Sequence, residues 1–256
     1  MTTAMVAFQT RATFVAILIL PAVSKVARVW NATIAVVMLA ALLLQLWIAV
    51  RVSATPPAHA VGTLAGAPVA NRVLRVLSFF TVQSNIISGV TSAQLARDPD
   101  RDGRSWRAVR LASLFGITVT GIVYATVLAK VHEPHGWQET FTNDVFHYVV
   151  PIMMIVGWVL FGPRPRIEAR TIGLAILWPV VWVVYTLIHG AITSWYPYPF
   201  VDVPTHGYAL VFLNAVLVVV VLLVVTAVFW MGDRRLPPPL RASTLPTDLP
   251  ARPASV

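Results

Sequence analysis

The chain has 256 residues, of which 57% are hydrophobic and 11% charged, and its mean hydropathy is +0.76. A soluble domain averages about 25% charged residues, so this composition excludes an ordinary soluble domain and indicates an integral membrane protein. The absence of cysteine excludes disulfides, thiolate metal ligands and a cysteine nucleophile. The net charge of +9 does not indicate nucleic-acid binding, because the basic residues lie at the ends of apolar segments.

Apolar segments of roughly 20 residues recur along the chain, and each is long enough to cross a bilayer core as a helix. Lipid offers no partner for backbone groups, so a spanning segment must be helical. The sequence therefore predicts an all-α polytopic membrane protein with a six-helix transmembrane domain over residues 30–232. The predicted spans are 30–50, 74–95, 109–130, 141–161, 171–192 and 208–231.

The two ends of the chain differ from this domain. Residues 1–29 contain the run ATFVAILILPAVS, whose short apolar stretch followed by small residues resembles a signal peptide. Cleavage there would invert the charge pattern, so we instead expect an interfacial or partly inserted segment ahead of the first span. Residues 233–256 are rich in proline and lack apolar periodicity, which predicts a disordered cytoplasmic tail.

The distribution of basic residues predicts the orientation. Of the 19 Lys and Arg residues, only Arg51, Arg72, Arg75 and Lys130 fall on one side of the predicted spans. The other fifteen fall on the side that also holds both chain ends. Cytoplasmic loops carry an excess of Lys and Arg, so both termini are expected to be cytoplasmic.

The second span contains the polar stretch SFFTVQSN, in which Thr81, Ser84 and Asn85 share one helix face. Thr81 lies roughly 10 Å and His147, in the fourth span, roughly 9 Å from the outer ends of their helices, at 1.5 Å per residue. Ionisable groups within a span usually face a cavity or the bundle interior. Asp144 lies one turn before His147 and is placed to orient its imidazole and raise its basicity.

Two interpretations of this cluster compete. In the first, the hydroxyls bond back to their own helix, Asn85 joins two helices, and His147 is a satisfied interior side chain. In the second, Thr81 is a nucleophile and His147 is the general base that takes its proton. Ser84 or Asn85 would then donate a hydrogen bond to the developing oxyanion.

The motifs LSFFTVQSN and NDVFHYVVP, in a chain with six predicted helices, resemble the family of the androgen-induced protein and the androgen-dependent TFPI-regulating protein. The resemblance covers residues 25–232, and the segment WPVVWVVYTLIHGAITSWYPYPFVDV is similar to the bacterial branch of that family. It implies a membrane threonine hydrolase that cleaves fatty-acid esters of hydroxy fatty acids. When the family's motifs are matched to this sequence, the catalytic Thr corresponds to Thr81 and the catalytic His to His147. The resemblance also implies a multi-pass protein of a bacterial cell membrane.

The outer loop WYPYPFVDV joins the last two spans. Its two prolines favour an extended, stiff segment, and its aromatic rings suit either an anchor at the headgroup level or a lid over the Thr81–His147 site. As a lid, it would place Asp202 at the rim of the site. His189, near the outer end of the fifth span, would serve as a second acid/base or hydrogen-bond across the bundle.

Three other classes of function stay open. The first is a metal site on the outer face, for which the available ligands are His132, Glu133, His135, His206 and Asp202. The second is a haem held between His147 and His189, although the two lie at different depths. The third is a transporter or a non-catalytic membrane protein, but the sequence shows neither the internal repeat nor the broken helix that transporters commonly have.

The expected function is an integral membrane hydrolase that cleaves a lipid ester by attack of Thr81, with His147 as base. Its partners would be the bilayer and an ester substrate that enters from the outer leaflet, with no nucleic acid involved. This chemistry requires no cofactor, and no metal is assigned to the site.

Overall fold

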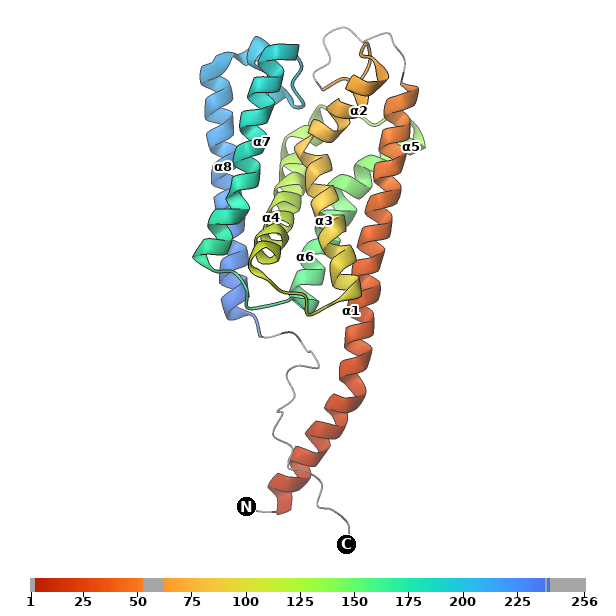
Figure 1. Cartoon of the computed structure of the whole chain (residues 1–256), viewed down its shortest axis with the longest axis vertical. Coiled ribbons are helices and arrows are strands. Elements are labelled where there is room, and N and C mark those ends of the chain that lie inside the picture. Colours follow the sequence, from red (N-terminus) through yellow and green to blue (C-terminus); the bar gives the residue numbers. More distant parts are fainter. Residues whose placement is uncertain (1–2, 53–61, 238, 240–256) are drawn as a thin grey trace.

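A computed structural model describes residues 3–52, 62–237 and 239, with residues 3–22 as backbone alone. Within these residues the regular structure is entirely helical (Figure 1). The elements are α1 (Thr3–Arg51), α2 (Val69–Ser78), α3 (Phe80–Arg97), α4 (Arg104–Thr126), η1 (Leu128–Lys130), α5 (Gly136–Asp144), η2 (Val145–Val149), α6 (Val150–Phe161), α7 (Ala169–Thr193), η3 (Pro199–Val201) and α8 (Val203–Arg235).

Five of the described segments are long and apolar enough to cross a membrane, namely Val23–Arg51, Arg104–Lys130, Gly136–Phe161, Ala169–Thr193 and Val203–Arg235. The pair α2 and α3 makes a sixth if the two count as one span, although they meet at an angle of 71°. The predicted all-α polytopic fold is therefore confirmed. With six spans, the start of α1 and the end of α8 lie at the same end of the bundle (Figure 1).

The structure describes only part of the two terminal segments for which the sequence made predictions. α1 runs without interruption from Thr3 to Arg51, and its first turns project beyond the bundle (Figure 1). The boundary predicted after residue 29 is thus not a break in the helix, and membrane insertion of residues 12–24 stays a prediction. α8 ends at Arg235, a few residues later than predicted, and almost all of the predicted disordered tail lies outside the described residues.

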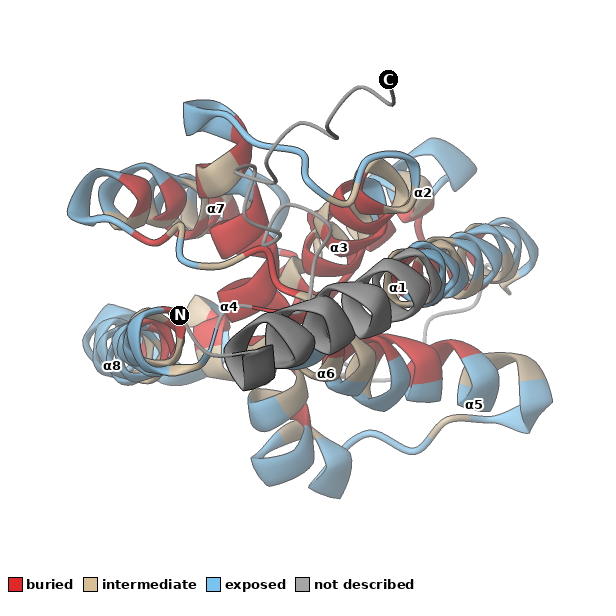
Figure 2. Cartoon of the chain, turned by 90° about the horizontal axis from the view of Figure 1, so that it is seen from below, coloured by how far each residue is buried: buried red, intermediate tan, exposed pale blue. Residues whose placement is uncertain are grey.

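The segments coloured as buried lie mainly toward the middle of the bundle, where α4 contacts α3, α6, α7 and α8 (Figure 2). α4 is the most buried span because it contacts α3, α6, α7 and α8. Small residues let the helices approach, as at Gly116 of α4, where a Cβ atom would lie 2.6 Å from the Trp178 ring of α7. The outward faces carry exposed Val, Leu and Ile side chains, as expected for surfaces that meet lipid.

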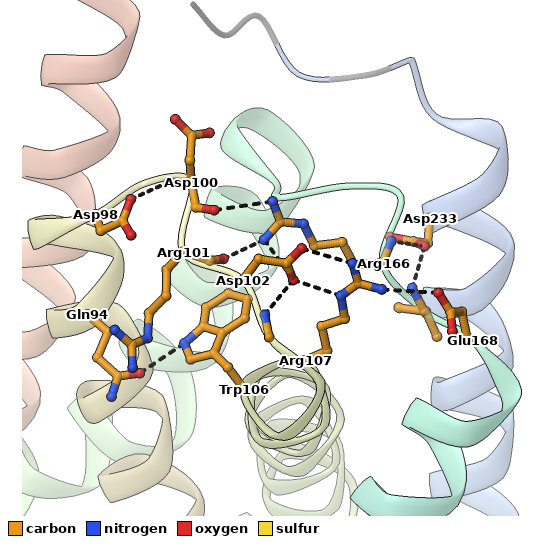
Figure 3. A network of polar contacts seen from close by, with 12 residues as sticks. Gln94, Asp98, Asp100, Arg101, Asp102, Trp106, Arg107, Arg166, Glu168 and Asp233 are labelled. Carbon is orange, nitrogen blue, oxygen red and sulfur yellow. Dashed lines mark hydrogen bonds and ion pairs between the residues drawn. The ribbon is translucent and has the colours of Figure 1, made fainter. Parts of the chain in front are cut away.

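A charged network holds the end of the bundle that carries the α3–α4 and α6–α7 loops (Figure 3). This end is predicted to face the cytoplasm and is called the inner end, and the opposite end is called the outer end. Asp102, in the α3–α4 loop, lies between Arg107 and Arg166, at 2.7 and 3.4 Å. Arg107 also pairs with Glu168 at 3.0 Å. The Arg107 guanidinium holds the pKa of the Asp102 carboxyl well below its usual range. Two inner loops are thereby tied to each other.

Candidate functional site

The second span is interrupted at Phe79, whose extended backbone (φ −66°, ψ 131°) separates α2 from α3. Backbone groups freed inside a membrane must find partners on neighbouring side chains. The Trp182 indole N–H of α7 donates to the Ser78 carbonyl at 2.9 Å. The Thr81 N–H donates to the Tyr198 hydroxyl at 3.0 Å. The interruption is thus held by α7 and by the outer loop.

This interruption corrects the prediction of one straight span over residues 74–95. No proline or glycine marks it in the sequence, because its cause is tertiary pairing with Trp182 and Tyr198. Interrupted spans are also found in transporters, where they usually come in repeats. In the part of the chain that the structure describes, one such bent pair occurs.

The Thr81 hydroxyl is buried and lies 3.1 Å from the Tyr198 hydroxyl. Burial raises the pKa of Tyr198 to about 12, so the phenol stays neutral at physiological pH. Its oxygen already accepts the Thr81 N–H, which leaves its own O–H free to donate to Thr81 Oγ1. The Thr81 hydroxyl proton is then available to another acceptor.

Thr81 lines a cavity of about 800 Å³ between α3, α4, α7, α8 and the outer loop. Ligand pockets commonly have volumes of about 300–1,000 Å³ with apolar walls and a few polar groups. Val180, Val184 and Phe212 line the cavity and are also exposed, so it reaches the lipid-facing surface of the bundle. The site is therefore accessible from the membrane.

The outer loop closes the outer end of this cavity. Tyr198, Phe200 and Val201 line it, and Trp195 and Tyr196 are buried against the protein. Tyr196 packs onto Gly190 of α7, where a Cβ atom would lie 2.1 Å from the ring. The loop rings thus pack against the protein and form part of the cavity wall, and the lid and the headgroup anchor both stay predictions.

His147 lies in η2, a π-helical turn that interrupts the fourth span. Pro151 has no N–H to offer to the His147 carbonyl and its ring would clash there in a regular α-helix, which explains the wider turn. His147 Nδ1 lies 2.9 Å from the Asn143 carbonyl, and the ring stacks on Tyr124 at 3.8 Å. A donating Nδ1–H leaves Nε2 as the free acceptor.

The structure brings the Thr81 and His147 segments together. Asn85 Nδ2 donates to the Thr81 carbonyl at 2.9 Å and to the Phe146 carbonyl at 3.1 Å, so α3 and η2 are neighbours at this level. Among the hydrogen bonds of the described residues, none joins Thr81 Oγ1 to His147. His147 is also not among the described residues that line the cavity with Thr81. The nucleophile–base pair stays a prediction.

The supporting residues of the predicted site lie elsewhere. Asp144 is exposed and its carboxylate accepts from the Asn143 side chain at 3.4 Å, so the Asn143 carbonyl orients His147 in its place. Ser84 is fully buried, and its hydroxyl has no hydrogen-bond partner among the described residues. Asn85 joins two helices, as the packing interpretation expects. Neither Ser84 nor Asn85 lines the cavity.

His189 and Asp202 also lie away from the cavity wall. His189 Nδ1 lies 3.4 Å from the Thr193 hydroxyl of its own helix, and its ring stacks on Tyr185. Asp202 is buried at the start of α8, where its carboxylate accepts the Thr205 hydroxyl. The Asp202 carbonyl also accepts the His206 N–H at 3.1 Å, so Asp202 joins the loop to the first turn of α8, ahead of the non-helical Gly207.

The alternative metal ligands are dispersed. His132 Nδ1 lies 3.4 Å from the Tyr124 hydroxyl, the His135 N–H donates to Glu139, and His206 is exposed. Within residues 23–52, 62–237 and 239, no three His, Asp or Glu side chains are placed to hold one metal ion. His147 and His189, the alternative haem ligands, stack on different tyrosines, Tyr124 and Tyr185.

Sequence reasoning missed Tyr198 as a partner of Thr81, and it missed Thr120 and Thr186 as cavity residues. The spacing of Thr186, one turn after Trp182 on the same face of α7, could have indicated that the two side chains face the same surroundings. No comparable signal links Tyr198 to Thr81, because 117 residues separate them.

The fold and the cavity define an all-α, multi-pass membrane protein with an apolar chamber that opens to lipid. No family model, curated protein or solved structure matches the chain. The resemblance to the androgen-induced protein family therefore depends on the motifs around Thr81 and His147 and on the outer loop.

Proposed function

We propose that this chain is an integral membrane hydrolase that cleaves lipid esters, with Thr81 as nucleophile and His147 as general base. The observation that carries the proposal is the position of Thr81, a buried hydroxyl in the wall of a largely apolar cavity that reaches the lipid-facing surface. A lipid tail in this cavity would bring its ester group to the level of Thr81. Substrate would enter laterally from the bilayer.

The reaction would proceed in two halves. Thr81 Oγ1 attacks the ester carbonyl while its proton passes to His147 Nε2, and His147 then protonates the departing alkoxide. His147 then takes a proton from water, the hydroxide attacks the acyl-threonine carbonyl, and His147 returns the proton to the departing Thr81 Oγ1 as the acid is released. The Asn143 carbonyl supports this role, because its contact with Nδ1 favours the tautomer with a free Nε2. The Thr81 hydroxyl must turn from Tyr198 toward η2 for the first step.

A lipid-binding protein without hydrolytic activity is the second candidate. The observation that favours it is the hydrogen bond of Thr81 Oγ1 to a tyrosine, together with the Asn85 bridge between helices. In that case Thr81 fastens the outer loop to the interrupted span, and the cavity holds lipid without reacting with it.

One experiment separates the two candidates. The purified chain is treated with a fluorophosphonate probe and assayed on a long-chain nitrophenyl ester, as wild type, Thr81→Ala, Thr81→Ser and His147→Ala. The hydrolase predicts labelling of wild type and Thr81→Ser, and none of Thr81→Ala. Hydrolysis should fall about 10³-fold or more without the nucleophile or the base.

Thr126→Ala is the matched control, because Thr126 is at the same end of the bundle but exposed and bonded to its own helix. It should keep full labelling. Unchanged labelling of Thr81→Ala would exclude Thr81 as nucleophile. An unlabelled, inactive wild type that still binds ester lipid would support the second candidate.

A further inference from the structure

Three arginines at the outer end of α1 and α2 have no carboxylate partner among the described residues. They are Arg51, Arg72 and Arg75, three of the four basic residues that the sequence places on the outer side. The ion pairs between described residues all lie at the inner end. Basic residues are scarce on the outer side of membrane proteins, and an ionisable group at the edge of a span usually has a function. Each of these arginines therefore needs another explanation.

Helix ends account for two of the three. Arg51 is exposed in the last turn of α1, where the helix dipole favours a cation. The Nη1 atom of Arg72 donates to the Val52 carbonyl, just beyond the end of α1. Arg75 also lies in the last turn of its own helix, α2, but its guanidinium contacts two outer loops instead of the end of that helix. The position of the Arg75 guanidinium is thus not explained by a helix end.

One edge of the half-buried Arg75 guanidinium is occupied and the other is free. Its Nη1 atom donates to the Thr63 carbonyl at 3.1 Å, and its Cζ atom lies 5.3 Å from the centre of the Trp195 ring. Its Nε and Nη2 atoms make no hydrogen bond with a described residue, and neither is among the buried polar atoms that lack a partner. Both atoms therefore reach the molecular surface. Together they form an edge that can bind two oxygens of a carboxylate or phosphate at once.

A second nitrogen lies on the α7 side of the same tryptophan. The His189 ring lies edge to face with the Trp195 ring at 5.7 Å, so His189 and Arg75 both contact this indole. The Thr193 hydroxyl donates to the His189 carbonyl, which leaves its oxygen as an acceptor for His189 Nδ1 at 3.4 Å. His189 Nε2 makes no hydrogen bond within the described part of the chain and is also not among the buried atoms without a partner. A protonated His189 can therefore donate from Nε2 to an anion at the surface.

These side chains lie at the level expected for lipid headgroups. α7 has 25 residues, so it is roughly 37 Å long at 1.5 Å per residue, against a bilayer core of about 30 Å. His189 lies roughly 6 Å from the outer end of α7, near the border between the core and the headgroups. The Ser78 and Tyr185 hydroxyls, 2.6 Å apart, join α2 to α7 here. Leu77, next to Ser78, and Ile188, next to His189, are exposed apolar side chains that suit lipid tails.

We propose that the outer surface between α2 and α7 binds the phosphate of an outer-leaflet phospholipid. The free edge of Arg75 would hold two phosphate oxygens, and His189 Nε2 would be a second donor. Phosphate is the oxoanion that phospholipid headgroups present at this level, and Arg binds it bidentately. Neither residue lines the cavity, so this site is separate from that of the proposed hydrolase and does not depend on it.

The test uses the full chain in a neutral detergent at pH 7 and three pyrene-labelled probes with the same tail: a phosphate monoester, a carboxylate and an uncharged methyl ester. Energy transfer from the tryptophans of the protein to pyrene measures binding. Thr81→Ala serves as the background, so that hydrolysis does not consume the ester. We expect the phosphate to bind about tenfold more tightly than the ester, as hydrogen bonds to a charged group give. The carboxylate, with one charge, should bind more weakly than the phosphate.

Arg75→Gln should bind the phosphate probe no more tightly than the ester probe. Arg75→Lys keeps the charge but loses the bidentate edge, so it should retain only part of the preference. His189→Gln should reduce the preference less than Arg75→Gln does. Arg51→Gln is the matched control, because Arg51 is an exposed arginine at the same end of the bundle, and it should keep the full preference.

Trp195→Phe separates a lost headgroup contact from a loosened outer loop. The Trp195 indole N–H donates to the Thr63 carbonyl at 2.9 Å, the same carbonyl that Arg75 contacts. Replacing Trp195 weakens this loop contact and leaves the free edge of Arg75 in place. The variant should unfold at a lower temperature and keep the preference for phosphate.

A preference for phosphate that survives Arg75→Gln, or that is lost equally in Arg51→Gln, would overturn the proposal. Tighter binding of the carboxylate than of the phosphate would also overturn it. So would displacement of the phosphate probe by an equal concentration of inorganic phosphate, because a phospholipid would then not be the ligand.

Discussion

The two ends of this bundle carry different kinds of polar group. At the inner end, Asp102, Arg107, Arg166 and Glu168 pair with one another, and Asp233 Oδ2 accepts two loop N–H groups (Figure 3). Toward the outer end, the described residues of the cavity wall include hydroxyl side chains and no charged ones. Buried polar atoms without a partner among the described residues occur at both ends, as at Asp233 Oδ1 and at the Thr120 hydroxyl. Ion pairs therefore hold the inner end, whereas apolar packing forms the outer cavity.

The largest loss of stability is expected from replacing Asp233 at the inner end of the bundle. Its Oδ2 atom accepts the N–H groups of Arg166 and Ile167 at 2.7 and 2.8 Å. Asp233→Ala leaves both donors without a partner, so the free energy of unfolding should fall by about 2 kcal/mol or more. The midpoint of thermal unfolding in detergent measures this.

Labelling by the fluorophosphonate probe near room temperature should be unchanged by Asp233→Ala, because Asp233 does not line the cavity. Glu133→Ala is the control, since Glu133 is exposed and its replacement should change stability by less than about 0.5 kcal/mol. Loss of labelling in folded Asp233→Ala would show that the two ends are not independent.

A smaller loss is expected from Tyr198→Phe, which removes the acceptor of the Thr81 N–H at the interrupted span. One unpaired buried N–H should cost about 1–3 kcal/mol. Phe keeps the ring contacts, so Tyr198→Leu should be less stable than Tyr198→Phe. Unchanged thermal stability of Tyr198→Phe would show that the hydroxyl does not hold the interruption.

Because of Tyr198, the folded chain should also lose stability at alkaline pH. Its pKa is raised to about 12 in the folded chain, against about 10 when unfolded. Between these values the unfolded chain releases a proton that the folded chain retains, so stability falls as pH rises above 10. Unfolding midpoints measured from pH 8 to 11 should show this decline in wild type and a weaker one in Tyr198→Phe.

Removing a hydroxyl of the cavity wall should instead raise the stability of the folded chain. Thr120→Val and Thr186→Val should each raise the stability of the ligand-free chain, by about 1 kcal/mol, because each removes a buried hydroxyl without a partner. Thr118→Val removes a made hydrogen bond and should not stabilise. Destabilisation by both cavity substitutions, read from thermal unfolding without lipid, would show that their hydroxyls are paired in the protein.

The smallest effect on stability is expected from replacing Asp102, whose side chain is partly exposed. Its pKa is lowered by Arg107, so its contribution to stability is present above the unfolded value near 4 and is lost as pH falls below it. Wild type should therefore lose stability on acidification more steeply than Asp102→Asn. Identical pH profiles from pH 3 to 6 would exclude this contribution.

The sequence by itself determined the class of the protein and the approximate bounds of the five uninterrupted spans. These follow from runs of apolar residues and from bilayer thickness, which are local properties of the chain. It also identified the segments around Thr81 and His147 as polar parts of their spans, since hydroxyls and imidazoles within apolar runs are visible without any tertiary information.

Tertiary structure alone decided the rest. The interruption at Phe79, the pairing of Thr81 with Tyr198 and the choice of Asn143 over Asp144 as the partner of His147 depend on how segments meet. The cavity arises because α7, α8 and the outer loop meet α3 and α4 around a space that their side chains leave unfilled. Which hydroxyl finds a partner is settled by neighbours that lie far away along the chain, and no local pattern encodes those distances.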